Sequence, residues 1–150
     1  MYRSLYFGIA RLSSLNAEVG RRTFLFLDPY NEIRIRNARL LNDNLCENES
    51  LKIPKPFVAG QPVYLRFPIV FPKKEARRRV FWMLSRHRLG ASRSYLTPLN
   101  EIPAFRKYLC AEDDYPGAKF VADRILTLPT HPYVNEQDIQ KIVSRINRIT

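Results

Sequence analysis

Hydrophobic residues recur every three or four positions in the first part of the chain, which is the spacing of one helix face. This pattern runs from about Arg11 to Leu45, and Asp28 with Pro29 interrupts it because proline disturbs a helix interior. The apolar positions before and after the interruption are Leu12, Leu15 and Val19, then Ala38, Leu41 and Leu45. We therefore expect a long N-terminal helical segment that is broken near Asp28.

Strict alternation replaces this pattern after a connector. The stretch from Pro54 to Pro62 is rich in proline and cannot continue a helix. From Val63 to Phe71 every second residue is apolar, so a strand with one hydrophobic face is expected. Pro68 lacks a backbone donor, which favours an edge strand or a bulge.

Helical spacing returns between Lys73 and Leu89, and Gly90 is expected to end this amphipathic helix. The apolar face consists of Ala76, Val80, Met83, Leu84 and His87. Beyond it we expect a strand over Ser92–Leu96 and short helices over Ala104–Leu109 and Ala118–Ile125.

The C-terminal part has a short β-prone run, Leu126–Leu128, that Pro129 ends. Asn135 can cap a final helix, with Asp138 three places later completing a capping box. This order of elements predicts an α+β fold, with a small, mainly antiparallel sheet covered by helices. We expect a helical segment over 1–50, a linker over 51–61 and an α+β domain over 62–150.

The composition limits where the protein acts. The formal net charge of +11 favours contact with an acidic partner. The apolar stretches are shorter than the roughly 20 residues of a spanning helix, and the first residues lack a secretory-signal pattern. We therefore expect a cytoplasmic protein that does not enter a membrane. Cys46 and Cys110 have no further cysteine or histidine at ligand spacing, which predicts reduced thiols and no metal site.

Arg77, Arg78 and Arg79 follow one another on the expected helix over 73–89 and could neutralise phosphates. A solvated helix face accounts for the same charge, and no helix-turn-helix, zinc or RNA-recognition pattern accompanies it. We therefore expect no specific nucleic-acid partner. His87 and His131 have no evident partner for acid–base chemistry, and no glycine-rich phosphate loop is present.

Several longer stretches match a known sequence pattern. They are Arg11–Gly20 and Arg34–Leu45 in the first part, then Gly90–Asn100 with Pro103 and Phe105, Pro116–Arg124, and Leu126–Val134 with Asp138 and Ile139. Together they resemble the C-terminal end of the DegT/DnrJ/StrS family of aminotransferases, in which the first two stretches form the interdomain helix. The sequence of these stretches is most similar to that of divergent family members from exopolysaccharide gene clusters.

The resemblance implies a pyridoxal-phosphate (PLP) enzyme that makes amino sugars on nucleotide carriers, with this chain as its small domain. The family's cofactor lysine lies in a large upstream domain, and none of the seven lysines here has that context. Such chemistry requires an activated amine. We therefore expect no catalytic or cofactor-binding residue in this chain and no activity alone. The implied partners are a large aminotransferase domain or second subunit, and a further copy in a homo-oligomer.

The resemblance places substrate contacts at Arg93, Ser94 and Tyr95. Ser94 stands where the family often has a histidine. Ile9 stands where an asparagine normally reaches the cofactor phosphate of a neighbouring subunit, and it cannot donate that hydrogen bond. These departures and the charge leave a second interpretation open, a non-enzymatic basic module that binds nucleic acid or acidic polysaccharide.

Overall fold

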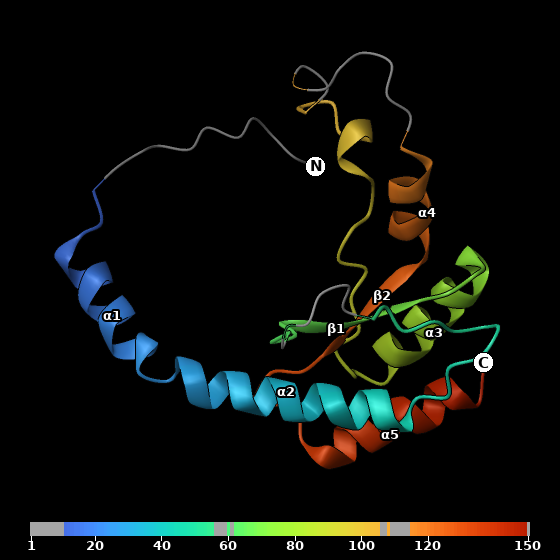
Figure 1. Cartoon of the computed structure of the whole chain (residues 1–150), viewed down its shortest axis with the longest axis horizontal. Coiled ribbons are helices and arrows are strands. Elements are labelled where there is room, and N and C mark those ends of the chain that lie inside the picture. The colour runs from blue at the N-terminus through green and yellow to red at the C-terminus, as the bar shows by residue number, and fades with distance from the viewer. Residues whose placement is uncertain (1–10, 56–59, 61, 106–107, 109–114, 150) are drawn as a thin grey trace.

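The chain forms a two-stranded antiparallel sheet surrounded by helices, from which a helical arm extends to one side (Figure 1). The computed structural model describes residues 11–55, 60, 62–105, 108 and 115–149. The elements in chain order are α1 (Ser14–Phe24), α2 (Leu27–Asn44), β1 (Arg66–Val70), α3 (Lys74–Arg86), the short 3₁₀ helix η1 (Leu99–Glu101), α4 (Pro116–Arg124), β2 (Ile125–Pro129) and α5 (Glu136–Asn147). The expected α+β class is confirmed.

The arm consists of α1 and the first turns of α2, and the expected break between them is confirmed. The backbone N–H of Phe26 bonds to the carbonyl of Thr23, which closes α1 with a tight turn. Pro29 follows in the first turn of α2, where a helix does not need the N–H that proline lacks. The proline therefore begins the second helix and does not kink a continuous one.

Helix α2 packs on α5, and both cover one side of the sheet (Figure 1). Ala38 and Leu41 of α2 are buried, and the side-chain amide of Asn37 donates to the carbonyls of Thr130 and Val134 at 3.1 and 3.2 Å. The core combines residues of α2, both strands, α3 and α5 with Leu51 and Ile53 of the expected linker. The proposed domain limits at 50 and 61 stay a prediction.

The sheet pairs β1 with β2 in the register Phe67 opposite Leu128 and Ile69 opposite Leu126. The N–H of Val70 donates to the carbonyl of Lys52 at 2.8 Å, on the side of β1 away from β2. The nitrogen of Pro68, two residues earlier, faces this same outer side because the backbone alternates. The edge position expected from Pro68 is therefore confirmed.

The expected strand over Val63–Phe71 is too long at its start. Phe67, Ile69 and Phe71 are buried, but Leu65 is 73% exposed. The cause is Tyr64, whose φ of 54° lies in the left-handed region and breaks the alternation of an extended chain. The apolar row therefore begins at Phe67.

The end of α3 also corrects the expectation. The helix ends at Arg86, before the expected Gly90, and the residue that closes it is Arg88, with a left-handed φ of 56°; Gly90 follows with φ of 67°. The N–H groups of Arg88 and Leu89 bond to the carbonyls of Ser85 and Leu84, which is the Schellman pattern. His87 is exposed and does not extend the apolar face.

Two of the remaining expected elements formed. Helix α4 corresponds to the expected helix over Ala118–Ile125, and α5 begins with the expected capping box of Asn135 and Asp138. The expected strand over Ser92–Leu96 is wrong, because the segment makes only one bridge, between Ser92 and Thr127. The expected helix over Ala104–Leu109 lies partly outside the described residues.

Candidate functional site

The three residues expected to contact substrate lie in the segment that runs along the outer edge of β2. Ser92 and Thr127 exchange two backbone hydrogen bonds of 2.9 Å, which anchor the start of this segment to the strand. Arg93, Ser94 and Tyr95 follow and are exposed. The position of their side chains therefore depends on how firmly β2 holds Ser92.

A polar network lies beneath Ser94. The hydroxyl oxygen of Thr127 accepts a hydrogen bond from Nε of Arg66 at 2.8 Å, and Ser94 Oγ lies 2.6 Å from the same oxygen. The Thr127 hydroxyl donates to the carbonyl of Ser92 at 3.2 Å. Nη2 of Arg66 adds bonds to the carbonyls of Thr127 at 2.9 Å and Gly90 at 2.6 Å. One arginine thus connects β1, β2 and the candidate segment.

The Thr127 hydroxyl joins Ser94 to the rest of the network. A hydroxyl has one proton and two acceptor lone pairs. The oxygen of Thr127 accepts from Nε of Arg66 at 2.8 Å, and its proton can be shared between the carbonyl of Ser92 at 3.2 Å and Oγ of Ser94 at 2.6 Å. Either hydroxyl can be the donor in the Ser94–Thr127 pair, and Ser94 presents its remaining hydrogen-bonding capacity on the exposed side.

Arg66 and Thr127 were not predicted from the sequence. Thr127 is 5% exposed within β2, and partial burial lowers the pKa of the Arg66 guanidinium from its usual value. Arginine still remains charged near neutral pH because its ordinary pKa is so high. An arginine in an apolar strand and a threonine between two leucines are the sequence signals that could have indicated them.

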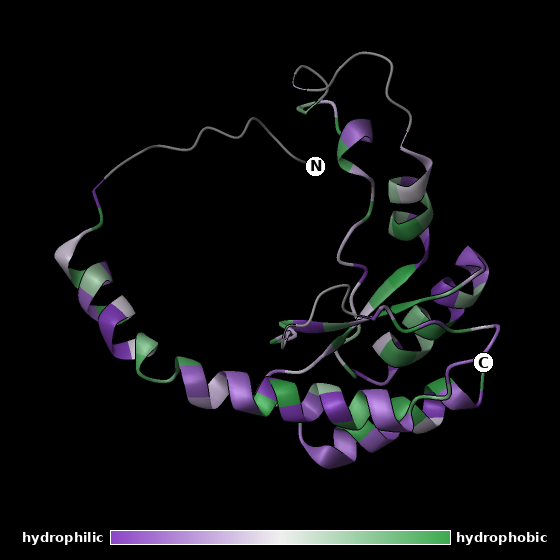
Figure 2. Cartoon of the chain, viewed as in Figure 1, coloured by the Kyte–Doolittle hydropathy of each residue, from purple (hydrophilic) through white to green (hydrophobic). Residues whose placement is uncertain are grey.

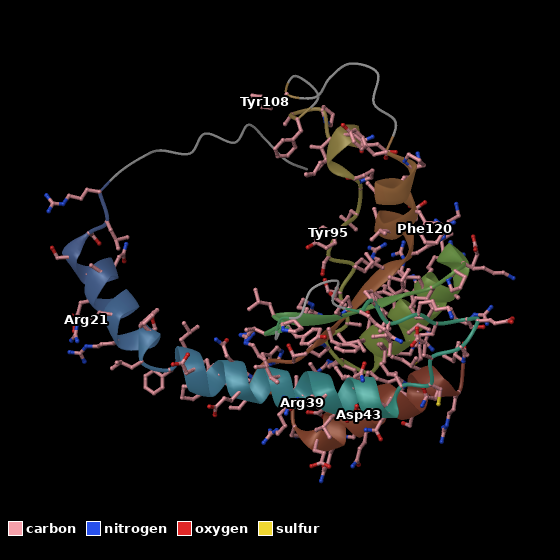
Figure 3. The ribbon with its side chains drawn as sticks, viewed as in Figure 1. Arg21, Arg39, Asp43, Tyr95, Tyr108 and Phe120 are labelled. Atoms are coloured by element: carbon pink, nitrogen blue, oxygen red, sulfur yellow. The ribbon has the colours of Figure 1, made fainter. Side chains whose placement is uncertain are left out.

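The other two expected residues point elsewhere. The guanidinium of Arg93 lies over the ring of Phe81 on α3, with 4.7 Å between its central carbon and the ring centroid. The pKa of Arg77 is lowered mainly by its own burial and further by the positive charge of Arg93. Tyr95 is 62% exposed and lies on the side of its segment away from Phe120 of α4 (Figure 3). The structure therefore places only Ser94 in the network with Thr127.

Six of the seven lysines lie within the described residues, and all six are exposed. Lys119 and Lys141 lie 2.7 and 3.7 Å from the carboxylates of Glu101 and Asp138. A Schiff-base lysine needs a desolvated or otherwise activated amine, and exposure leaves these six amines solvated. Among the residues that the structure describes, no group of histidine, cysteine and acidic residues could hold a metal ion.

Helix α1 has no buried residue and stands clear of the sheet and its helices (Figure 2). Apolar side chains nevertheless recur along it and its junction with α2. The most exposed are Leu12, Leu15, Val19, Phe24, Leu25 and Phe26, each at least 52% exposed. Glu18 pairs with Arg21 and Arg22 at 2.8 and 2.7 Å beside these apolar positions. Within the described residues, the apolar side chains of the arm therefore have no covering surface.

The family assignment rests on a family model that matches residues 2–147. The chain belongs to the DegT/DnrJ/EryC1/StrS aminotransferase family. The expected resemblance is thereby confirmed, although no curated protein matches the chain significantly. Ile9, where members of the family often have asparagine, lies outside the described residues.

Several solved sugar aminotransferases share the fold. DesV of S. venezuelae, seen with a ketimine intermediate, superposes with a TM-score of 0.81 at 20% identity, over 98% of this chain and 40% of its own. A family member from Brucella abortus gives 0.77 at 24% identity, over 98% and 39%. PseC of Helicobacter pylori, involved in pseudoaminic acid biosynthesis, gives 0.71 at 14% identity, over 99% and 42%. The chain therefore spans about 40% of the length of these aminotransferases.

Within the described residues no helix is both long and apolar enough to cross a membrane. Cys46 is a free, exposed thiol, and Cys110 lies outside the described residues.

Replacing Thr127 by valine is expected to destabilise the network. Valine keeps the shape of threonine but leaves Nε–H of Arg66 without its acceptor, and an unsatisfied part-buried donor costs about 1–3 kcal/mol. The measurement is the free energy of unfolding in urea. Ser94→Ala is the control and should lose less, because Ser94 is exposed and water replaces its partner. A Thr127→Val protein as stable as the parent would contradict this description of the site.

Proposed function

We propose that this chain is the C-terminal small domain of a pyridoxal-phosphate-dependent sugar aminotransferase that transfers an amino group to a nucleotide-linked keto sugar. The family match over residues 2–147 and the superposition on about 40% of several sugar aminotransferases support this proposal. The exposed lysines support its second part, that the aldimine lysine and the cofactor belong to a separate large domain. The chain alone is then inactive. It would act in the cytoplasm, in the biosynthesis of amino sugars for an exopolysaccharide.

In the proposed enzyme the edge segment of β2 contributes to the sugar site. Ser94 offers an exposed hydroxyl that is anchored by its hydrogen bond with Thr127. A hydroxyl has one proton and two acceptor lone pairs, so it can pair with the hydroxyl groups of a sugar. Tyr95 supplies an exposed ring and hydroxyl beside it, and Arg93 a charge held over Phe81. These three residues remain the proposed substrate contacts.

The exposed arm supports a role in assembly. The apolar side chains of α1 and its junction would each gain roughly 1.5–3 kcal/mol on burial, and soluble proteins rarely leave such a continuous row in water. We propose that a large aminotransferase domain and a second copy of the chain cover them in a homo-oligomer. The basic surface of the chain would then face solvent or an acidic ligand.

The proposed function is tested by supplying the large domain. The coding sequence that precedes Met1 is read for a segment with the family's cofactor lysine, and that segment is produced together with this chain. Amino transfer from glutamate to a nucleotide-linked keto sugar is followed through formation of 2-oxoglutarate. We expect turnover by the pair and none by this chain alone. Turnover by this chain alone would contradict the proposal.

A further inference from the structure

The outward face of α3 carries a tryptophan framed by positive charge. On a helix the surface neighbours of a residue are those three and four positions away. For Trp82 these are Arg78, Arg79, Ser85 and Arg86, so its neighbours on the helix surface are three arginines and a serine. All three arginines are exposed, and Trp82 is 63% exposed. No described acidic side chain forms an ion pair with any of these arginines.

The run of arginines in the sequence does not form one face. Arg77 turns inward, where its Nε donates to the carbonyl of Asp123 at 3.0 Å and burial lowers the pKa of its guanidinium. Arg78 and Arg79 face solvent with Trp82. Glu75, the one acidic residue of α3, lies two turns before Trp82, about 10 Å along the helix axis. It precedes Arg78 and Arg79 by three and four residues, but no ion pair joins it to either arginine within the described residues. The charged groups nearest the ring are therefore the arginines.

A hollow of about 650 Å³ adjoins the ring. Its described lining consists of Trp82, Met83, Ser85, Arg86 and His87. Hollows of this size accommodate small molecules, and the lining combines one flat aromatic face with basic and hydroxyl groups. The carbonyls at a helix C-terminus repel anions, but here the N–H groups of Arg88 and Leu89 occupy two of them.

We propose that this face, formed by Arg78, Arg79, Trp82, Ser85 and Arg86 and here called the α3 face, binds a nucleoside phosphate. A nucleobase stacks on the exposed indole, as bases do on aromatic side chains elsewhere. The phosphate lies against the guanidinium groups, which pair with phosphate oxygens in a bidentate way. Arg78 and Arg86 are about 12 Å apart along the helix axis, one on each side of Trp82. When the base covers Trp82, the phosphate therefore contacts the arginines on one of these two sides. This site is separate from Ser94 and does not depend on the proposed aminotransferase function.

Trp82 is the one tryptophan of the sequence, so its fluorescence reports on this site alone. The full chain is titrated with AMP, adenosine, inorganic phosphate and glucuronate in low salt. We expect saturable quenching by AMP. Adenosine and inorganic phosphate should each bind about tenfold or more weakly than AMP, because adenosine lacks the phosphate contacts and phosphate lacks the stacked base. Binding of AMP should weaken as salt rises, because its phosphate contacts are screened.

Variants assign the contacts. Equilibrium dialysis with labelled AMP is used, because Trp82→Ala removes the fluorophore. Trp82→Ala and the pair Arg78→Gln with Arg86→Gln should each weaken AMP binding about tenfold or more. The matched control changes two exposed arginines of α2, Arg36→Gln with Arg39→Gln, which removes the same charge and should leave binding unchanged. Circular dichroism verifies that each variant is folded.

Each of the following results would overturn the proposal. Quenching by millimolar AMP does not saturate, adenosine binds as tightly as AMP, or glucuronate binds more tightly than AMP. The same holds if the control pair loses as much AMP binding as the pair Arg78→Gln with Arg86→Gln. A single-stranded oligonucleotide that binds more than about tenfold tighter than AMP would also overturn it, because it would assign the α3 face to nucleic acid.

Discussion

Removal of α1 is expected to convert a self-associating chain into a monomer. Leu15 and Val19 are 73% and 52% exposed on α1, and Phe24, Leu25 and Phe26 continue the apolar surface into the junction with α2. These side chains find no surface within the described part of the chain. When two copies cover each other's arms, the gain from burial exceeds the cost of association. We therefore expect a dimer with a micromolar dissociation constant, which corresponds to a binding free energy of about −8 kcal/mol.

The truncation must spare α2. A version that starts at Leu51 would lose Ala38 and Leu41 from the core, and its unfolding would obscure the result. A version that starts at Leu27 removes the arm and keeps the helix that packs on α5. Light scattering on both forms gives the molar mass directly. We expect a dimeric or larger full chain and a monomeric truncated chain.

Point variants separate the apolar row from the length of the arm. Leu15→Ser with Val19→Ser keeps α1 but removes two central side chains, and should also give a monomer. Arg21→Ser is the control, because Arg21 lies on the opposite side of α1 and pairs with Glu18 there. If the full chain, the truncated chain and the variants all have the mass of a monomer, α1 is not an association surface.

Local signals in the sequence predicted those elements whose causes are local. The capping box of Asn135 and Asp138 satisfies backbone donors within one turn, so it marked the start of α5 correctly. Pro68 marked the edge of the sheet for an equally local reason, the missing donor. The helical period also revealed the core face of α3, where Val80 and Leu84 are buried.

Predictions failed where a distant contact or a backbone choice decides the structure. Gly90 is the residue with the lowest cost for a left-handed conformation, but Arg88 adopts one first because Leu89 then becomes buried. Tyr64 ends the alternation of β1 in the same way, and its sequence context gives no sign of it. The strand over Ser92–Leu96 had suitable residues but only Ser92 finds a partner.

The candidate site was predicted only in part for a similar reason. The resemblance indicated Arg93, Ser94 and Tyr95 through their place in a motif. Arg66 and Thr127 are 61 residues apart in sequence and meet only because β1 pairs with β2. No spacing rule connects them. The polar network was therefore visible only in the fold, although the residues beside it could be identified from the sequence.

We expect that no lysine of this chain forms the cofactor aldimine. The six lysines within the described residues are exposed, whereas a Schiff-base lysine needs a desolvated or otherwise activated amine. Any imine that forms between such amines and pyridoxal phosphate is spread over several sites and reverses on dilution. A true cofactor site instead binds one molecule per chain at one residue.

The most direct measurement is an absorption spectrum of the isolated chain after incubation with pyridoxal phosphate and removal of the excess by gel filtration. We predict no stoichiometric aldimine band, and the spectrum should match that of the chain without cofactor. The contrary result is a band of one cofactor per chain that survives filtration and disappears when one lysine is replaced by alanine. That result would place the reactive centre in this chain and contradict the claim that it needs a separate large domain.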